Sequence, residues 1–167
     1  GKFVAVAKGG IAGSRAMICS NYGDISDIAP DSWVLVQPGQ SMDESTARDG
    51  LYSVKITGDG TTERGTITQK LYFDSGTRYI LSGFGKVQNL TAGSLRVDIL
   101  NGTSIVKELI WDVDTDWSQR KITFKFDVRP TDAYIRVRGY NLNSGAVVNC
   151  DKLLIEKASD YELSQTG

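Results

Sequence analysis

Apolar and polar residues alternate in short runs along most of the chain after about residue 50. A period of two is typical of a β-strand that buries one face, because successive side chains point to opposite sides of a sheet. No window of helix length shows a 3.6-residue period. The pattern predicts about eight or more strands, which at this spacing form a sandwich or a barrel. The clearest runs are residues 51–56, 66–73, 78–84, 95–100, 105–111, 121–126, 133–140 and 147–155.

Turn-forming residues separate these runs. Asn101-Gly102 lies between two alternating runs and predicts a tight hairpin, because Asn and Gly tolerate a positive φ. Glycine or Asx residues also fill the gaps at 58–60, 74–76, 130–132 and 143–145. The abundance of glycine, 18 residues against 3 prolines, fits an architecture with many tight turns.

Charge and composition exclude several classes of function. The chain carries 19 basic and 20 acidic side chains, for a net charge of −1, so it lacks the basic surplus of proteins that neutralise phosphates. It contains no histidine, the commonest general base and transition-metal ligand. No apolar run approaches the length needed to span a bilayer. We therefore expect neither a nucleic-acid partner nor a membrane-spanning segment.

A series of motifs occurs in a characteristic order between residues 16 and 157. The motifs are Pro30-Asp-Ser-Trp33, Arg48-Asp-Gly-Leu-Tyr-Ser-Val-Lys-Ile56, Gly76-Thr-Arg-Tyr-Ile-Leu-Ser-Gly-Phe-Gly-Lys86, Thr115-Asp-Trp-Ser118 and Asn149-Cys-Asp-Lys-Leu-Leu-Ile-Glu156. In this order they resemble the jelly-roll carbohydrate-binding modules of families four, nine and twenty-two, relatives of which occur in tail and baseplate proteins of bacterial viruses. The resemblance implies an all-β fold, with two antiparallel sheets packed as a jelly-roll sandwich.

The ends of the chain differ from its body. Residues 1–15 are mostly small and glycine-rich, and residues 158–167 are polar. We interpret the first segment as an N-terminal linker or extension, the second as a C-terminal linker, and residues 16–157 as the module itself. Both ends then connect to neighbouring domains of a larger chain.

The resemblance also implies a function. It predicts a non-catalytic, extracellular or virion-associated module that attaches a phage tail protein or a glycoside hydrolase to a polysaccharide or cell-surface glycan. Enzymatic activity is not expected, because the acidic residues lie mainly in turns and at strand ends rather than in a recognisable catalytic pair. The alternative is a structural spacer or protein-interaction domain.

A sugar site needs flat apolar surface for the ring and fixed polar groups for the hydroxyls. Alternation places Arg136, Arg138 and Tyr140 on one face of their strand, and Arg96 faces away from the apolar residues of its own strand. We predict that these four residues line a groove on one sheet. Gln69 joins them on the resemblance alone. The alternative is a solvated outer face with cross-strand charge pairs.

The three tryptophans need separate interpretations. Trp111 ends a strand and joins the predicted sugar-binding set as a stacking platform beside a loop, with a core position as the alternative. Trp33 has the same two interpretations because it follows a loop. Trp117 matches a structural position of the resembled modules and is predicted to lie in the core.

The resemblance further implies a structural calcium ion near the first and last strands, with Asp151 as the matched ligand. Asp24 or Asp27 could add oxygen ligands, which a hard cation requires. The alternative is that Asp151 caps a turn or pairs with a lysine. Residues 112–116 resemble the start of an EF-hand loop, but Trp117 stands where that loop needs glycine, so a polar turn is predicted there.

The chain has two cysteines, Cys19 and Cys150. They fall in the first and last strands, which are neighbours in the resembled fold. A disulfide in an oxidising compartment and two buried free thiols are both compatible with the sequence.

Overall fold

The computed structural model describes the β-rich body of the chain, and every regular element in the described residues is a β-strand. No helix in those residues has the length and hydropathy needed to cross a membrane. The described residues are 16–18, 33–35, 40–43, 45–48, 53–61, 63–68 and 70–158. Within them, only the backbone is described at 16–18, 33–35, 40–42 and 64–68.

The described residues form eleven strands, so the predicted all-β class is confirmed. The predicted linkers fall on residues 1–15 and 158–167, of which only Ala158 is described, so the domain bounds stay a prediction. The strands are β1 (Ala16–Ile18), β2 (Trp33–Leu35), β3 (Gln40–Asp43), β4 (Ser53–Thr57), β5 (Arg64–Thr68), β6 (Arg78–Gln88), β7 (Ser94–Asn101), β8 (Ser104–Trp111), β9 (Thr115–Lys125), β10 (Ala133–Tyr140) and β11 (Val147–Lys157).

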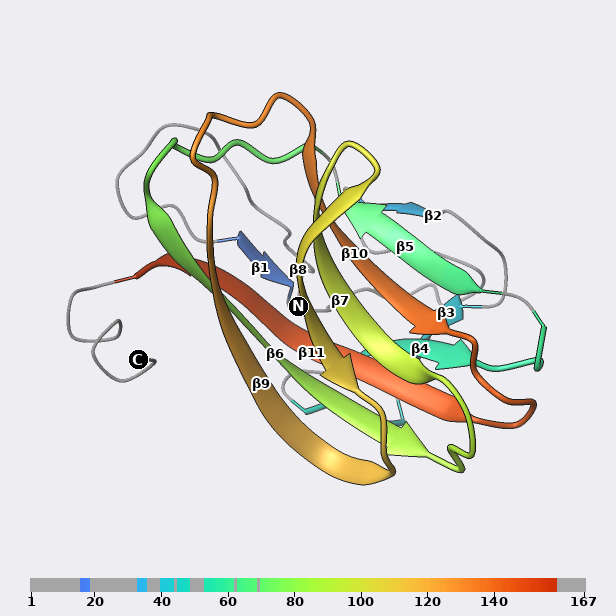
Figure 1. Ribbon diagram of the computed structural model, residues 1–167. Helices are drawn as coiled ribbons and strands as arrows, with labels where there is room; N and C mark the ends of the chain where they lie inside the picture. The colour runs from blue at the N-terminus through green and yellow to red at the C-terminus, as the bar shows by residue number, and fades with distance from the viewer. Residues whose placement is uncertain are drawn as a thin grey trace.

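The strands form two sheets that lie face to face (Figure 1). One sheet has the order β3-β4-β11-β6-β9, and β1 also pairs with β11, outside this order. The other sheet has the order β2-β5-β10-β7-β8. Every ladder between named strands is antiparallel. The predicted two-sheet antiparallel sandwich is therefore confirmed, as is the neighbouring position of the first and last described strands.

Two local features show how the sequence directs the chain. Asn101 pairs with Ser104 across the β7–β8 hairpin, and Gly102 has a φ of 59° at the first position of the two-residue turn. A glycine tolerates that conformation without strain, so the predicted hairpin is confirmed. The predicted run 66–73 is interrupted: β5 ends at Thr68, and Leu71 forms only an isolated bridge to Ala133.

Each sheet turns its apolar face inward, and these faces form one core. Roughly 1.5–3 kcal/mol of stabilisation accompanies full burial of one such aliphatic side chain. At one end, Phe73 contacts the rings of Tyr79, Phe124 and Phe126. The aliphatic core includes Leu81, Val87, Leu95, Val97, Ile99, Ile135, Val137, Val148 and Leu153. Because core positions alternate along β7 and β10, the intervening residues face outward, and these carry the candidate site.

Candidate functional site

The outer face of the five-stranded sheet brings four of the predicted binding residues together. Strands β7 and β10 are neighbours, and their register sets Arg136 opposite Asp98 and Arg138 opposite Arg96. Tyr140 lies opposite Ser94 at the end of the ladder. Directly opposed side chains on one face of a sheet are close enough to interact. The four residues therefore share one face, as predicted. Arg96 and Tyr140 line the hollow described below, whereas Arg136 and Arg138 are not among its lining residues, so a groove lined by all four stays a prediction.

Asp98 is the centre of this face, and its side chain has no exposed surface (0%). Its Oδ2 atom accepts a hydrogen bond from Arg136 Nε at 2.7 Å and lies 2.7 Å from Arg136 Nη2. Arg138 Nε lies 2.8 Å from the same oxygen, but it makes no directed hydrogen bond, so this contact is ionic. Oδ1 has no hydrogen-bond partner among the described residues. Burial raises the pKa of the Asp98 carboxyl, outweighing the two guanidiniums that lower it.

Two glutamates complete the charge balance. Glu108 Oε2 lies 3.1 Å from Arg96 Nη1 and 3.8 Å from Arg138 Nη2. Glu63 Oε1 lies 3.0 Å from Arg138 Nη1. Sequence reasoning did not include either glutamate. Alternation along β8 was a signal for Glu108, since Leu109 and Trp111 face inward, whereas Glu63 lies before a strand and gives no local signal.

A hollow opens at the end of this face, where β10 ends and β7 begins. Its volume is about 470 Å³. The Arg96 guanidinium lies over the Tyr140 ring, with Cζ 4.1 Å from the ring centroid, and Arg96 Nε donates a hydrogen bond to Ser94 Oγ at 2.9 Å. Three neighbours therefore fix this guanidinium: Tyr140, Ser94 and Glu108. The hollow is lined by Ala92, Gly93, Ser94, Arg96, Ile110, Asp112, Tyr140 and Asn141.

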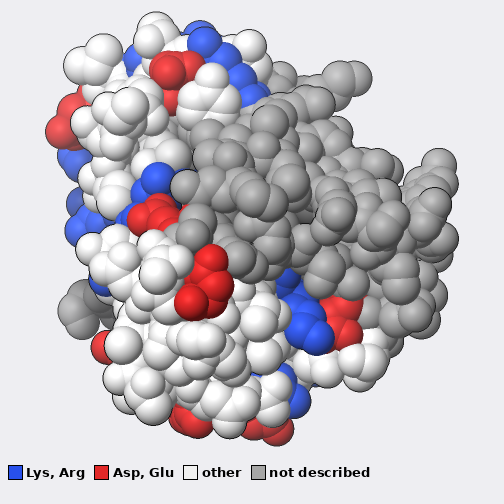
Figure 2. All heavy atoms as spheres, turned by 90° about the vertical axis from the view of Figure 1, so that its right-hand side faces the viewer, with Lys and Arg blue, Asp and Glu red and all other residues white. Residues whose placement is uncertain are grey.

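The chemistry of the hollow is mixed. The Ile110 side chain and the part of the Tyr140 ring that Arg96 and Arg138 leave uncovered offer apolar surface; the Arg138 Cζ lies 4.8 Å from the ring centroid. Arg96 donates and Asp112 accepts hydrogen bonds. On the side of the molecule shown in Figure 2, basic and acidic side chains of the described residues lie next to one another rather than in a patch of one sign. The hollow thus suits a polar ligand that has both donors and acceptors and an apolar face.

Trp111 was predicted as a stacking platform, and the structure shows that this is wrong. Its side chain has no exposed surface, and its indole packs so closely over Gly85 that a Cβ built there would lie 2.6 Å from the ring. Trp111 Nε1 donates a hydrogen bond to the Ser118 carbonyl at 3.1 Å. A ligand outside the sandwich has no access to this ring, so the alternative, a core position, is confirmed.

Other predicted positions have different outcomes. Arg138 shares the polar face, but its side chain is only 6% exposed, so it supports the face from beneath rather than meeting a ligand. Trp117 is half-buried on β9, which forms the edge of its sheet among the described strands, so its predicted core position is wrong. Gln69 lies outside the described residues, and of Trp33 only the backbone, in β2, is described.

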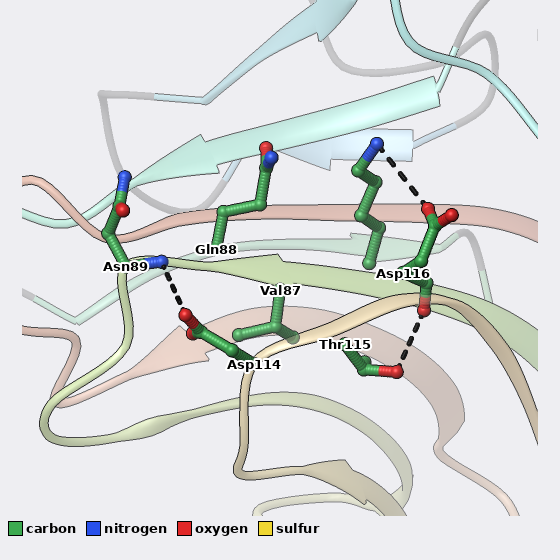
Figure 3. A pocket seen from close by; sticks show the side chains of 7 residues that line it. Val87, Gln88, Asn89, Asp114, Thr115 and Asp116 are labelled. Carbon is green, nitrogen blue, oxygen red and sulfur yellow. Dashed lines mark hydrogen bonds and ion pairs between the residues drawn. The ribbon is translucent and has the colours of Figure 1, made fainter.

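A second hollow, of about 460 Å³, lies between the ends of β6 and β9 (Figure 3). Asp114 points at the β6–β7 turn, where it accepts hydrogen bonds from the backbone N–H groups of Asn89 (3.1 Å) and Leu90 (2.7 Å). Asp116 pairs with Lys86 at 3.5 Å. Asp114 thus anchors the β6–β7 turn, whereas Asp116 joins β9 to β6. Residues 112–114 form a bend before β9, which confirms the predicted polar turn. The residues that line this hollow include no aromatic ring for a sugar to stack on.

Asp151, the predicted calcium ligand, is buried in β11. Its Oδ1 accepts a hydrogen bond from the Lys152 N–H at 2.6 Å, and its Oδ2 accepts one from the Arg48 N–H at 2.9 Å. No cluster of three or more His, Cys, Asp or Glu side chains occurs in the part of the chain that the structure describes. Asp24 and Asp27 lie outside the described residues, so calcium stays a prediction.

Cys150 is buried in β11, and burial raises the pKa of its thiol. Cys19 lies outside the described residues, so a disulfide between the two stays a prediction.

No protein-family model and no curated protein matches the chain. Solved structures do match, among them one described as "Family 16 Carbohydrate Binding Module-2", with a TM-score of 0.59 and 23% identity over 70% of this chain and 84% of that chain. The N-terminal cellulose-binding domain of Cellulomonas fimi β-1,4-glucanase C matches with a TM-score of 0.55 and 18% identity, over 84% of this chain and 99% of its own.

A structure described as the enzymatically active domain of bacteriophage CBA120 tailspike protein 4 also matches, with a TM-score of 0.58 and 12% identity over 77% of this chain but only 20% of that chain. At such identities the likeness establishes the fold. The predicted jelly-roll fold of carbohydrate-binding modules is confirmed.

Proposed function

We propose that this domain is a non-catalytic carbohydrate-binding module whose site is the hollow at the end of β7 and β10. The observation that carries the proposal is the immobilised Arg96–Tyr140 pair beside Ile110. A sugar presents C–H faces that pack on apolar surface and hydroxyls that both donate and accept hydrogen bonds. Because Arg96 is already fixed by its neighbours, a ligand gains its hydrogen bonds with little further loss of side-chain entropy.

The likeness to solved structures supports this proposal. Two of the matching structures carry carbohydrate or cellulose binding in their descriptions. A shared fold alone does not establish binding, so the proposal depends on the hollow.

The acidic residues of the polar face support a binding role over hydrolysis. Glycoside hydrolysis needs two carboxyl groups that reach the scissile bond. Asp98 has no exposed surface, and both Glu108 and Glu63 are engaged by guanidiniums. None of these three carboxylates is placed to flank a bound glycan.

The larger context belongs to the same proposal. We propose that the module serves a secreted or virion-associated protein and attaches it to a polysaccharide or cell-surface glycan. The domain of the Cellulomonas fimi glucanase and the tailspike protein share this fold as parts of larger proteins.

The second candidate is a spacer or protein-interaction domain. It is favoured by the ion pairs themselves, because Arg96, Arg136 and Arg138 each contact a carboxylate, as on a purely structural face. Such a domain would bind no glycan.

A glycan array and titration calorimetry on the whole chain separate the two candidates. The array should show binding, and Tyr140→Ala should weaken the best-bound oligosaccharide at least about tenfold, because the ring and its hold on Arg96 are both lost. Tyr72→Ala is the matched control: this tyrosine is 54% exposed and lies near the other end of β10, where Leu71 bridges Ala133.

We expect the control variant to bind like the wild type. An array on which the wild type binds no glycan would contradict the proposed function and favour the second candidate. If both variants weaken binding equally, the glycan does not bind at the hollow.

A further inference from the structure

Glu108 lies beside the hollow, where it contacts Arg96, one of the lining residues. It projects from β8 opposite Asp98, and its carboxylate reaches Arg96 at 3.1 Å without itself lining the hollow. The two side chains are both partly shielded, with exposures of 24% for Arg96 and 28% for Glu108. Salt and water screen such a pair less than one on an open surface. The Glu108 carboxylate therefore neutralises the charge of Arg96 before any ligand binds in the hollow.

The remaining charges near the hollow are negative or balanced. Asp112 is a lining residue. Arg136 and Arg138 both pair with the buried Asp98, and Arg138 also lies close to Glu63 and Glu108. The positive charges of Arg96, Arg136 and Arg138 are balanced by an equal number of negative charges, those of Asp98, Glu108 and Glu63. Asp112 then leaves one excess negative charge at the hollow. An anionic sugar placed there would lose its hydration and find no uncompensated cation.

We infer that Glu108 is a specificity-determining residue, which restricts the hollow to uncharged glycans by neutralising Arg96. The inference rests on the proposed function and adds the class of ligand that the site rejects: uronic-acid and sulfated glycans. Glu108 acts through Arg96 and is a positioning residue, not a ligand contact. Its carboxylate keeps the guanidinium on the Tyr140 ring and removes the charge that would attract an acid.

The test uses Glu108→Gln, which keeps an oxygen acceptor for Arg96 and removes the negative charge. The array carries neutral hexose oligomers beside uronic-acid and sulfated oligomers. The strongest neutral hexose oligomer and its C6-oxidised, uronic-acid form are then titrated against each protein at low and high salt. For the wild type, we expect binding of the neutral form and little or none of the acid.

In Glu108→Gln, we expect affinity for the acid to rise at least about fivefold at low salt, since an unopposed charge a few ångströms away acts at an intermediate dielectric. High salt should abolish the gain. Affinity for the neutral oligomer should change little. Glu63→Gln is the matched control, because Glu63 pairs with the buried Arg138, whereas Glu108 pairs with Arg96, which lines the hollow. It should leave the acid-to-neutral ratio at the wild-type value.

Two outcomes would overturn the inference while leaving the proposed function intact: a wild type that prefers acidic glycans, or a Glu108→Gln variant with the wild-type ratio. A wild type that binds no glycan would instead remove the proposed function. If Glu108→Gln does not fold, Glu108→Thr replaces it, because it also removes the negative charge beside Arg96 and suits an outward strand position.

Discussion

At the scale of single residues, Asp98 determines the arrangement of the polar face. Its register position opposite Arg136 and its burial beneath Arg138 join two guanidiniums to one carboxylate. Removing one member of a buried ion pair leaves the partner charge desolvated and unpaired, which costs more than the intact pair contributes. The site therefore depends on a residue that no ligand touches.

Asp98→Asn should lower the free energy of unfolding by about 3–5 kcal/mol, because the Arg138 and Arg136 charges lose their shared partner. Urea unfolding of both proteins measures this difference. Asp127→Asn is the control, since Asp127 pairs with Lys125 in an exposed position and its loss should leave the urea midpoint unchanged. A midpoint for Asp98→Asn equal to that of the control would show that the polar face does not depend on this carboxylate.

At the scale of elements, side chains as well as backbone ladders join neighbouring strands. Asn149 of β11 donates hydrogen bonds to Asp43 Oδ2 of β3 at 3.1 Å and to Ser53 Oγ of β4 at 2.9 Å. Ser45 adds hydrogen bonds to Asp43 Oδ1 from its N–H at 2.9 Å and its hydroxyl at 2.7 Å. A charged acceptor makes such hydrogen bonds stronger than neutral ones. This network couples three strands at one edge of the six-stranded sheet.

Burial alone would raise the pKa of Asp43, but the hydrogen bonds from Ser45 and Asn149 outweigh it and lower the pKa below the ordinary value of 3.8. A depressed folded-state pKa contributes stability above pH 3.8, and that stability is lost as the pH falls through the folded-state value. We therefore expect Asp43→Asn to lower the thermal midpoint at neutral pH. The difference from the wild type should shrink as the pH falls below 3.8. A difference that stays constant across that window would contradict a role for the Asp43 charge.

At the scale of the whole molecule, the alternation of apolar and polar residues predicted which way side chains face within a strand. It could not predict contacts between residues that are far apart in the sequence. Alternation in residues 95–100 and 133–140 was enough to predict which side chains are core and which form the polar face. It could not show that Trp111 would pack over Gly85 of the other sheet, nor that Glu63 would reach Arg138, because both contacts join segments far apart in sequence. Alternation likewise placed Arg138 on the polar face, but it could not show that the Arg138 side chain would be only 6% exposed.

The predicted calcium site also belongs to the scale of the whole molecule, because it is expected near the first and last strands, which come from opposite ends of the chain. The described strand β1 pairs with β11, and Asp151 lies in β11 with its carboxylate holding the Arg48 and Lys152 backbone N–H groups. A ligand that binds only the folded state stabilises it by about 2.7 kcal/mol at a hundred times its dissociation constant. If calcium binds there, the thermal midpoint with added calcium should exceed the midpoint with EDTA.

Asp151→Asn should remove that calcium-dependent increment, whatever it does to the midpoint in EDTA, because the lost hydrogen bonds affect both conditions equally. The increment, rather than the midpoint, is therefore the quantity to compare between the two proteins. Magnesium at the same concentration is the control, since it binds protein carboxylates with stricter octahedral geometry and retains its water. Midpoints that coincide in calcium and EDTA would show that no calcium ion stabilises the fold at Asp151, whose carboxylate then serves as a hydrogen-bond acceptor within β11.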